Sequence, residues 1–79
     1  MPVYYLAEPD FKWPDVGDRV TMLPPSVAGT EGDCRRPDGE KSPVIEPKPE
    51  FGRQHTVLDI VDAQLPRRGR VGKLTLTDG

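Results

Sequence analysis

The sequence predicts an all-β fold with little or no helix, and two observations lead to this prediction. The stretch from His55 to Thr77 contains two runs of alternating apolar and polar residues, HTVLDIV and RVGKLTLT, joined by the turn-like LPRRG. Ten prolines and eight glycines among 79 residues leave no long segment with helical periodicity. We therefore expect a fold built on a β-hairpin in the C-terminal third of the chain.

The size and composition of the chain limit the core that it can build. At 79 residues it forms one small domain at most, and burial in so small a domain supplies only about 3 to 5 kcal/mol of stability. Hydrophobic residues make up 34% of the chain and charged residues 30%. Because a weak core repays little of the entropy of ordering the chain, we expect neighbouring protein subunits of a larger assembly to hold it.

Neither the N-terminus nor the single cysteine indicates secretion. The segment MPVYYLAEPD lacks the basic region and the long apolar run of a signal peptide, and Cys34 cannot form an internal disulfide. No run of about 18 apolar residues is present to cross a membrane. We therefore expect a protein of cytoplasmic origin that has no membrane partner.

Residues 1–14 are predicted to form an aromatic arm ahead of a single β domain over residues 15–79. Val3–Leu6 is a short β-type run, and Pro9 follows it where a strand would end. Four of the five aromatic residues of the chain gather in this arm. One or two of them could cap a small core, whereas exposed aromatic side chains usually anchor an interface. The interface candidates in the arm are Tyr4, Tyr5, Phe11 and Trp13.

The predicted domain opens on a turn that leads into a strand. Pro14–Gly17 has the composition of a turn, and Arg19–Leu23 alternates Val20 and Met22 with polar residues. The VGDRV entry, together with the later strands in Gln54–Gly79, resembles SH3-like small barrels, a class that includes KOW-type and Tudor-like modules. Because this chain carries a long insertion where that class has a short loop, the resemblance implies a fold and no functional residues.

The insertion, residues 24–53, is predicted to be a proline-rich loop without helix or regular sheet. It contains six prolines and four glycines. Arg36–Gly39 has the composition of a β-turn. Pro43–Pro49 favours extended polyproline II, in which the backbone groups stay free for a partner. The apolar residues of this loop that we expect to contact a partner are Val44, Ile45 and Phe51.

The two C-terminal runs are predicted to be strands that each bury one apolar face. Alternation places Thr56 on the same face as two apolar residues of the first run, with His55 and Val57 on the other face. A helix over Gln54–Leu65 is the alternative, because apolar residues also fall at helical spacings there, but the β-branched content favours a strand. The residues expected to form the scaffold are Leu58, Ile60, Leu74 and Leu76.

The sequence offers little for catalysis, metals or cofactors. Cys34 and His55 are the candidate nucleophile and base, and the neighbouring arginines would favour a thiolate. One cysteine and one histidine are too few for structural zinc, and the acids of residues 31–40 do not match a calcium loop. The chain has no phosphate loop, serine elbow or dinucleotide fingerprint. We expect no catalytic, cofactor or metal site and no small-molecule substrate.

Positive charge is concentrated near the C-terminus. The formal net charge is −2, yet residues 67–79 carry four bases and one acid. Such a patch can dock on an acidic protein surface, neutralise phosphates, or keep a turn soluble. The acidic remainder of the chain opposes a nucleic-acid surface and favours a protein partner. The basic patch consists of Arg67, Arg68, Arg70 and Lys73.

These features predict a non-enzymatic structural or adaptor protein that binds neighbouring subunits. The most specific form of this hypothesis is a bacteriophage virion accessory component, of the capsid-cement or head–tail joining type, located in the virion. The alternative is a nucleic-acid-associated small-barrel module, such as a transcription or ribosome accessory factor, that uses the basic patch on phosphates.

Overall fold

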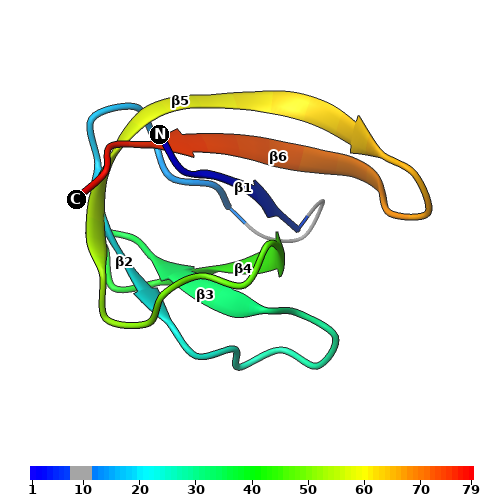
Figure 1. Cartoon of the computed structure of the whole chain (residues 1–79), viewed down its shortest axis with the longest axis horizontal. Helices are drawn as coiled ribbons and strands as arrows, with labels where there is room; N and C mark the ends of the chain where they lie inside the picture. The colour runs from blue at the N-terminus through cyan, green and yellow to red at the C-terminus, as the bar shows by residue number, and fades with distance from the viewer. Residues whose placement is uncertain (8–11) are drawn as a thin grey trace.

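The fold is a closed antiparallel barrel of six strands (Figure 1). The computed structural model describes residues 1–7 and 12–79, and this part of the chain contains no helix. Around the barrel the strands follow the order β1-β4-β3-β2-β5-β6. The prediction of an all-β fold is confirmed, and the barrel is compatible with an SH3-like small barrel. The strands are β1 (Val3–Leu6), β2 (Arg19–Leu23), β3 (Gly32–Arg35), β4 (Lys41–Glu46), β5 (Gln54–Leu65) and β6 (Gly69–Leu76).

β1 and β2 occupy the predicted residues, but β1 belongs to the barrel and not to a separate arm. It pairs with β4 on one side and with β6 on the other, and so closes the sheet. Side chains alternate along both strands, and Leu6, Val20 and Met22 have no exposed surface. The N-terminal segment therefore contributes directly to the core.

The expectation that residues 24–53 lack regular structure is wrong, because β3 and β4 lie within them. These strands pair with each other, and their outer edges pair with β2 and β1. The predicted turn between them is confirmed: the Gly39 N–H donates to the Arg36 carbonyl at 2.9 Å, and Gly39 has a φ of 84° that favours glycine. Pairing on both sides therefore overrides the high proline content.

Pro43 shows how a proline is accommodated inside β4. It lies opposite Asp33 in the ladder, and its carbonyl accepts a hydrogen bond from the Ala7 N–H at 3.0 Å. The N–H and C=O of one residue in an antiparallel strand point to the same side, so the N–H that Pro43 lacks would face Ala7, one residue past the end of β1. The missing donor thus falls at a ladder end, and the segment predicted as polyproline II is strand up to Glu46.

The core confirms part of the predicted scaffold and corrects the rest. Leu74 and Leu76 are fully buried, but Leu58 is 42% exposed. A β-bulge between Val57 and Asp59 causes this difference, because Leu58 is an extra residue without a partner on β6 and shifts the alternation. Ile60 is half-buried against the core after the bulge. The buried core cluster consists of Tyr4, Leu6, Val20, Met22, Cys34, Val44, Val57, Leu74 and Leu76.

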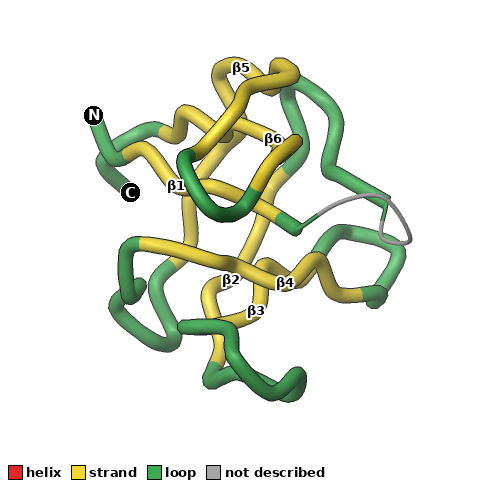
Figure 2. Tube along the Cα trace, turned by 90° about the vertical axis from the view of Figure 1, so that its right-hand side faces the viewer, coloured by secondary structure: helices red, strands yellow, loops and turns green. Residues whose placement is uncertain are grey.

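The β5–β6 hairpin is longer than the barrel that it helps to close. The strand interpretation of Gln54–Leu65 is confirmed, and the helical alternative is wrong. Its ladder with β6 continues to the Leu65–Gly69 pair, whereas the ladder between β1 and β6 ends at the Leu6–Gly72 pair. Figure 1 shows the hairpin reaching past the barrel, and Figure 2 views the molecule from the side of its tip.

Candidate functional site

The candidate site is the projecting part of the β5–β6 hairpin, residues 59–71, which we call the distal hairpin. β2 pairs with β5 only through residues 54–56, and two further backbone bonds join Val57 to Gly17 and Asp18. β1 pairs with β6 no further than Gly72. Beyond these points, the described strands give the distal hairpin no partner except its own second strand.

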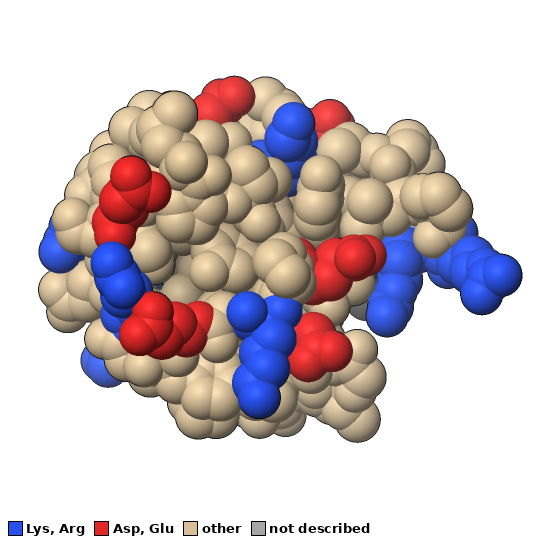
Figure 3. Space-filling view, in the orientation of Figure 1, with Lys and Arg blue, Asp and Glu red and all other residues tan. Residues whose placement is uncertain are grey.

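The tip of the distal hairpin is basic. Arg67 and Arg68 are exposed, and neither forms an ion pair with a described residue. Figure 3 shows Lys and Arg side chains at the end of the molecule where the hairpin projects. Arg67 has a φ of 70°, in the left-handed region where a residue with a Cβ is strained. Backbone strain at an exposed cationic residue suggests that something other than stability retains it.

The structure does not bring all four predicted cations together. Arg70 Nε lies 2.8 Å from Asp62 Oδ1, so its charge is partly neutralised. Lys73 is opposite Val61 and therefore shares its face of the hairpin. Arg70 and Lys73 are three residues apart, an odd number, and point to opposite faces. The basic surface is therefore centred on Arg67 and Arg68, which we call the basic tip.

Two apolar side chains of β5 are exposed, Leu58 just before the distal hairpin and Val61 within it. Leu58 is 42% exposed and Val61 is 43% exposed. After the bulge, Val61 shares a face with Ala63 and Leu65, and the polar residues Asp62 and Gln64 occupy the other face. Val61 is the exposed apolar residue of this face, because Ala63 and Leu65 are half-buried and Val71, opposite Ala63, is fully buried. The alternation is visible in the sequence VDAQL. Only the structure shows that this part of β5 projects past the barrel.

The predicted interface residues are divided between core and surface. Val44 has no exposed surface, Ile45 is 8% exposed and Tyr4 is 9% exposed, so these three cannot anchor a partner in this structure. Tyr5 is half-buried. Phe51 is 42% exposed, with Lys48 Nζ 5.6 Å from the centre of its ring. Phe11 lies outside the described residues.

Trp13 has a structural role beneath the hairpin. Its ring packs against the core, and its Nε1 donates a hydrogen bond of 3.0 Å to the Ala7 carbonyl. Ala7 lies opposite Pro43, so the indole supplies the donor that the proline lacks. These contacts explain the position of Trp13 within the fold, so no binding partner is needed to explain it.

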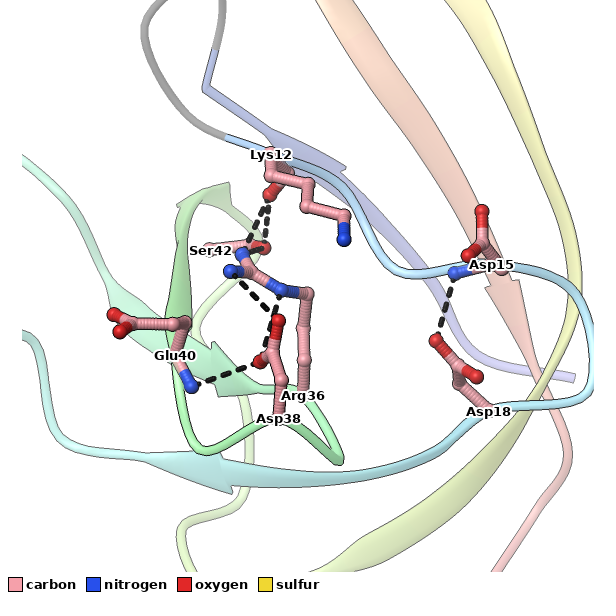
Figure 4. Close-up of polar contacts among 7 residues, drawn as sticks. All are labelled: Lys12, Asp15, Asp18, Arg36, Asp38, Glu40 and Ser42. Atoms are coloured by element: carbon pink, nitrogen blue, oxygen red, sulfur yellow. Dashed lines mark hydrogen bonds and ion pairs between the residues drawn. The ribbon is translucent and has the colours of Figure 1, made fainter.

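Arg36 forms a buried polar network that joins two segments (Figure 4). Its Nη1 donates to the Lys12 carbonyl and to Ser42 Oγ, both at 2.8 Å, and its Nε lies 3.4 Å from Asp38 Oδ1. A hydrogen bond from the Glu40 N–H, with the Arg36 charge nearby, lowers the pKa of Asp38. The network therefore fixes the segment before β2 against the β3–β4 turn. The sequence of Arg36–Gly39 predicts a turn but does not predict these contacts of Arg36, which we call the Arg36 clamp.

An open pocket of about 180 Å³ lies beside the Arg36 network. Charges of both signs face it, but Arg36 is held by protein groups, and Asp18 Oδ2 accepts a hydrogen bond of 2.9 Å from the Asp15 N–H. Because protein groups already hold these charges, the contacts favour a structural role for the residues around the pocket over a ligand-binding role. Its lining residues are Lys12, Trp13, Asp15, Asp18, Arg36, Pro37 and Asp38.

A second pocket, of about 190 Å³, lies where β5 meets the C-terminal segment. Arg53 donates to Glu50 Oε2 at 3.1 Å and to the Asp78 carbonyl at 2.7 Å. His55 Nδ1 lies 2.6 Å from the Thr77 carbonyl, which only accepts, so Nδ1 carries the proton. Burial raises the pKa of the Tyr4 phenol, which therefore stays protonated. These contacts join chain segments and do not assemble a nucleophile.

Cys34 lacks the environment of a catalytic cysteine. Its side chain is fully buried, and burial raises the pKa of the thiol to about 12. The coulombic effect of Arg36, which lowers this pKa, is the smaller influence. Because the thiolate is the nucleophile, a buried protonated thiol does not serve as one near neutral pH.

Metal-binding clusters, membrane-spanning helices and known relatives add no further assignment for the described residues. Within residues 1–7 and 12–79, no cluster of three or more His, Cys, Asp and Glu side chains is suited to hold a metal ion. The same part of the chain contains no helix long and apolar enough to span a membrane. Comparison of the chain with protein families, curated proteins and solved structures found no match.

Proposed function

We propose that this protein is a non-enzymatic structural or adaptor protein that binds neighbouring protein subunits through its distal hairpin. The observation behind this proposal is the projection of the hairpin past the barrel, with Val61 exposed on one face and the basic tip at its end. A two-stranded ribbon alone is marginally stable in water. A projecting ribbon that exposes Val61 and carries cations at its tip is therefore better explained as a contact surface than as a device for stability.

The most specific form of the proposal is a bacteriophage virion accessory component, of the capsid-cement or head–tail joining type, with an SH3-like barrel as its rigid body. A small barrel that presents one long hairpin suits this role, because the barrel positions the hairpin and the hairpin makes the contact. The strained Arg67 at the tip supports a functional reason for keeping a cation there.

Co-sedimentation with particles tests this proposal. Phage particles from the native source should carry the chain at a fixed ratio through a density gradient. Val61→Glu should strip the protein from particles without unfolding it, because Val61 is 43% exposed. Val27→Glu, at a 37% exposed position remote in sequence from the hairpin, is the matched control and should remain bound. Absence of the chain from purified particles, or equal loss of both variants, would contradict the proposal.

Nucleic-acid binding is the second candidate, and it is favoured by Arg67 and Arg68, which form no ion pair with a described residue. Phosphate contacts would give an affinity that falls steeply with salt. Asp59 and Asp62 lie on the same hairpin and oppose a polyanion. A salt titration of binding to duplex and single-stranded DNA and RNA discriminates the two candidates. Salt-sensitive binding lost in Arg67→Glu/Arg68→Glu would favour nucleic acid, whereas absence of binding at low salt would remove this candidate.

A further inference from the structure

The outer edge of β5 presents a short row of backbone groups that pair with no described residue. Backbone polar groups point alternately to the two sides of an antiparallel strand. The Leu65 carbonyl accepts from the Arg68 N–H at 3.1 Å inside the hairpin turn, so Leu65 faces β6. Counting back from Leu65, Ala63 and Val61 also face β6, and Gln64, Asp62 and Ile60 face outward. No described strand pairs with this outer edge.

The row of outward groups is closed at both ends. The Ile60 N–H donates to Asp59 Oδ1 at 3.0 Å, which confirms that it points out of the ladder and removes it as a free donor. At the other end, Pro66 has no N–H. A carboxylate over an edge donor and a proline are two means by which proteins protect strand edges. The complete donor and acceptor pairs that remain open belong to Asp62 and Gln64.

We propose that this edge pairs with the same edge of a second copy of the chain, antiparallel about a two-fold axis at Ala63. This inference rests on the proposed function and names one partner of the distal hairpin. In this register Asp62 of each copy lies opposite Gln64 of the other. These are hydrogen-bonded pairs, each of which exchanges two N–H···O bonds. The pairing uses the open groups and neither of the protected positions.

The side chains are complementary in the same register. Val61 of one copy lies opposite Leu65 of the other, so the exposed side chain of Val61 gains an apolar cross-strand neighbour. The Gln64 amide faces the Asp62 carboxylate and can donate to it. Arg67 falls in register with Asp59 of the second copy, which places the basic tip beside an exposed carboxylate.

Neighbouring registers of the same pairing are less favourable. An axis at Asp62 sets two carboxylates directly opposite each other, and like charges in that position are destabilising. An axis at Val61 requires the Ile60 N–H, which Asp59 already occupies. Self-complementarity in one register favours a second copy over an unrelated strand. The contact is small compared with the roughly 1,200 Å² of a stable complex, so we expect it to form at high protein concentration.

A cysteine scan over residues 61–65 tests the pairing and its register. Ala63 on the axis forms a non-hydrogen-bonded pair with Cα atoms about 4.5 Å apart, which a disulfide can bridge. Ala63→Cys should therefore form a disulfide-linked dimer under mild oxidation, several-fold faster than the exposed control Val27→Cys. Asp62→Cys and Gln64→Cys meet their symmetry mates only along a diagonal of about 7–8 Å and should cross-link poorly. The native Cys34 is buried and remains in every variant as a common background.

Sedimentation of the unmodified protein provides a test without cysteines. The mass should rise with concentration from 8.8 kDa towards twice that value. Gln64→Pro, which removes an outward donor and no ladder bond, should keep the barrel folded and remain monomeric, while Gln64→Ala should still associate. A monomer at all concentrations, or a cross-linking maximum away from residue 63, overturns the self-pairing. Particle binding that depends on Val61 would still support the proposed function in that case, so the two failures are distinguishable.

Discussion

The indole ring of Trp13 lies directly on Gly72, and a Cβ at residue 72 would come within 2.6 Å of Trp13 Cε2. Gly72 is the last residue of β6 that pairs with β1, so this contact marks the place where the hairpin leaves the barrel. The ring is held by its hydrogen bond to the Ala7 carbonyl and cannot simply rotate away. Trp13 and Gly72 therefore form a close-packed support under the base of the projecting hairpin.

Gly72→Ala should destabilise the barrel by about 1–3 kcal/mol, because the added methyl group overpacks against a fixed aromatic ring. Urea unfolding measures this change. Lys73→Ala, at the exposed neighbouring position, should have little effect. Adding Trp13→Leu to Gly72→Ala should cost less than the sum of the two single changes, since the clash is shared. Strict additivity would argue against the contact.

Arg36→Met should lower the free energy of unfolding by about 2–3 kcal/mol. It removes charge-assisted hydrogen bonds to the Lys12 carbonyl and Ser42 Oγ in a site where the arginine side chain is 7% exposed. Chemical denaturation should show the loss, and hydrogen exchange should locate it before β2 and in the β3–β4 turn. Arg35→Met, next in the chain but exposed, is the control. An equal effect at both positions would contradict the clamp.

Leu74→Ala should cost about 2–5 kcal/mol because it opens a cavity in the core. Leu58→Ala should cost well under half of that value, because Leu58 is 42% exposed at the bulge. Thermal or urea unfolding measures the loss of stability in each variant. Simple alternation would place both leucines on a buried apolar face and would predict similar losses. Comparable losses of stability in the two variants would contradict a bulge at Leu58.

Arg67→Gly should stabilise the isolated protein by up to about 1 kcal/mol, since glycine adopts a φ of 70° without the Cβ penalty. The same change should weaken partner binding if the basic tip contacts a partner. Unfolding and binding measurements on one variant thus move in opposite directions. Arg68→Gly should lose binding without the gain in stability, because the backbone of Arg68 is not in the left-handed region.

Cys34 should react slowly with iodoacetamide at pH 8 in the folded protein and quickly in denaturant, because burial raises the pKa of its thiol from 9.0 to about 12. Between these two values the unfolded thiol is ionised and the folded thiol is not. The unfolded state then binds fewer protons, so stability falls as the pH rises through this window. The stability advantage of the wild type over Cys34→Ala should shrink correspondingly between pH 8 and pH 11. Rapid alkylation of the folded protein would reopen the question of a reactive cysteine.

The sequence by itself determined the class of fold and several of its parts. Alternation of apolar and polar residues located β2 and both strands of the C-terminal hairpin, because a half-buried strand needs that period of two. A short β-type run, followed by Pro9 in the sequence, located β1. The composition of Arg36–Gly39 located the turn between β3 and β4 for an equally local reason. The charge distribution identified a basic hairpin tip, although it could not say which cations would be paired.

Only the tertiary structure decided the features that depend on pairing and packing between segments distant in the sequence. Residues 24–53 form two strands because β1 and β2 pair with their outer edges. The proline content of the segment does not reveal this stabilisation by distant strands. The bulge at Leu58 divided the predicted buried face of β5, because Ile60 packs against the core as expected but Val57 is buried before the bulge in place of Leu58. Val44 and Tyr4 became core residues when the barrel closed around them. The open edge of Asp62 and Gln64 exists because β5 outruns β2, a difference in length that only the assembled sheet defines.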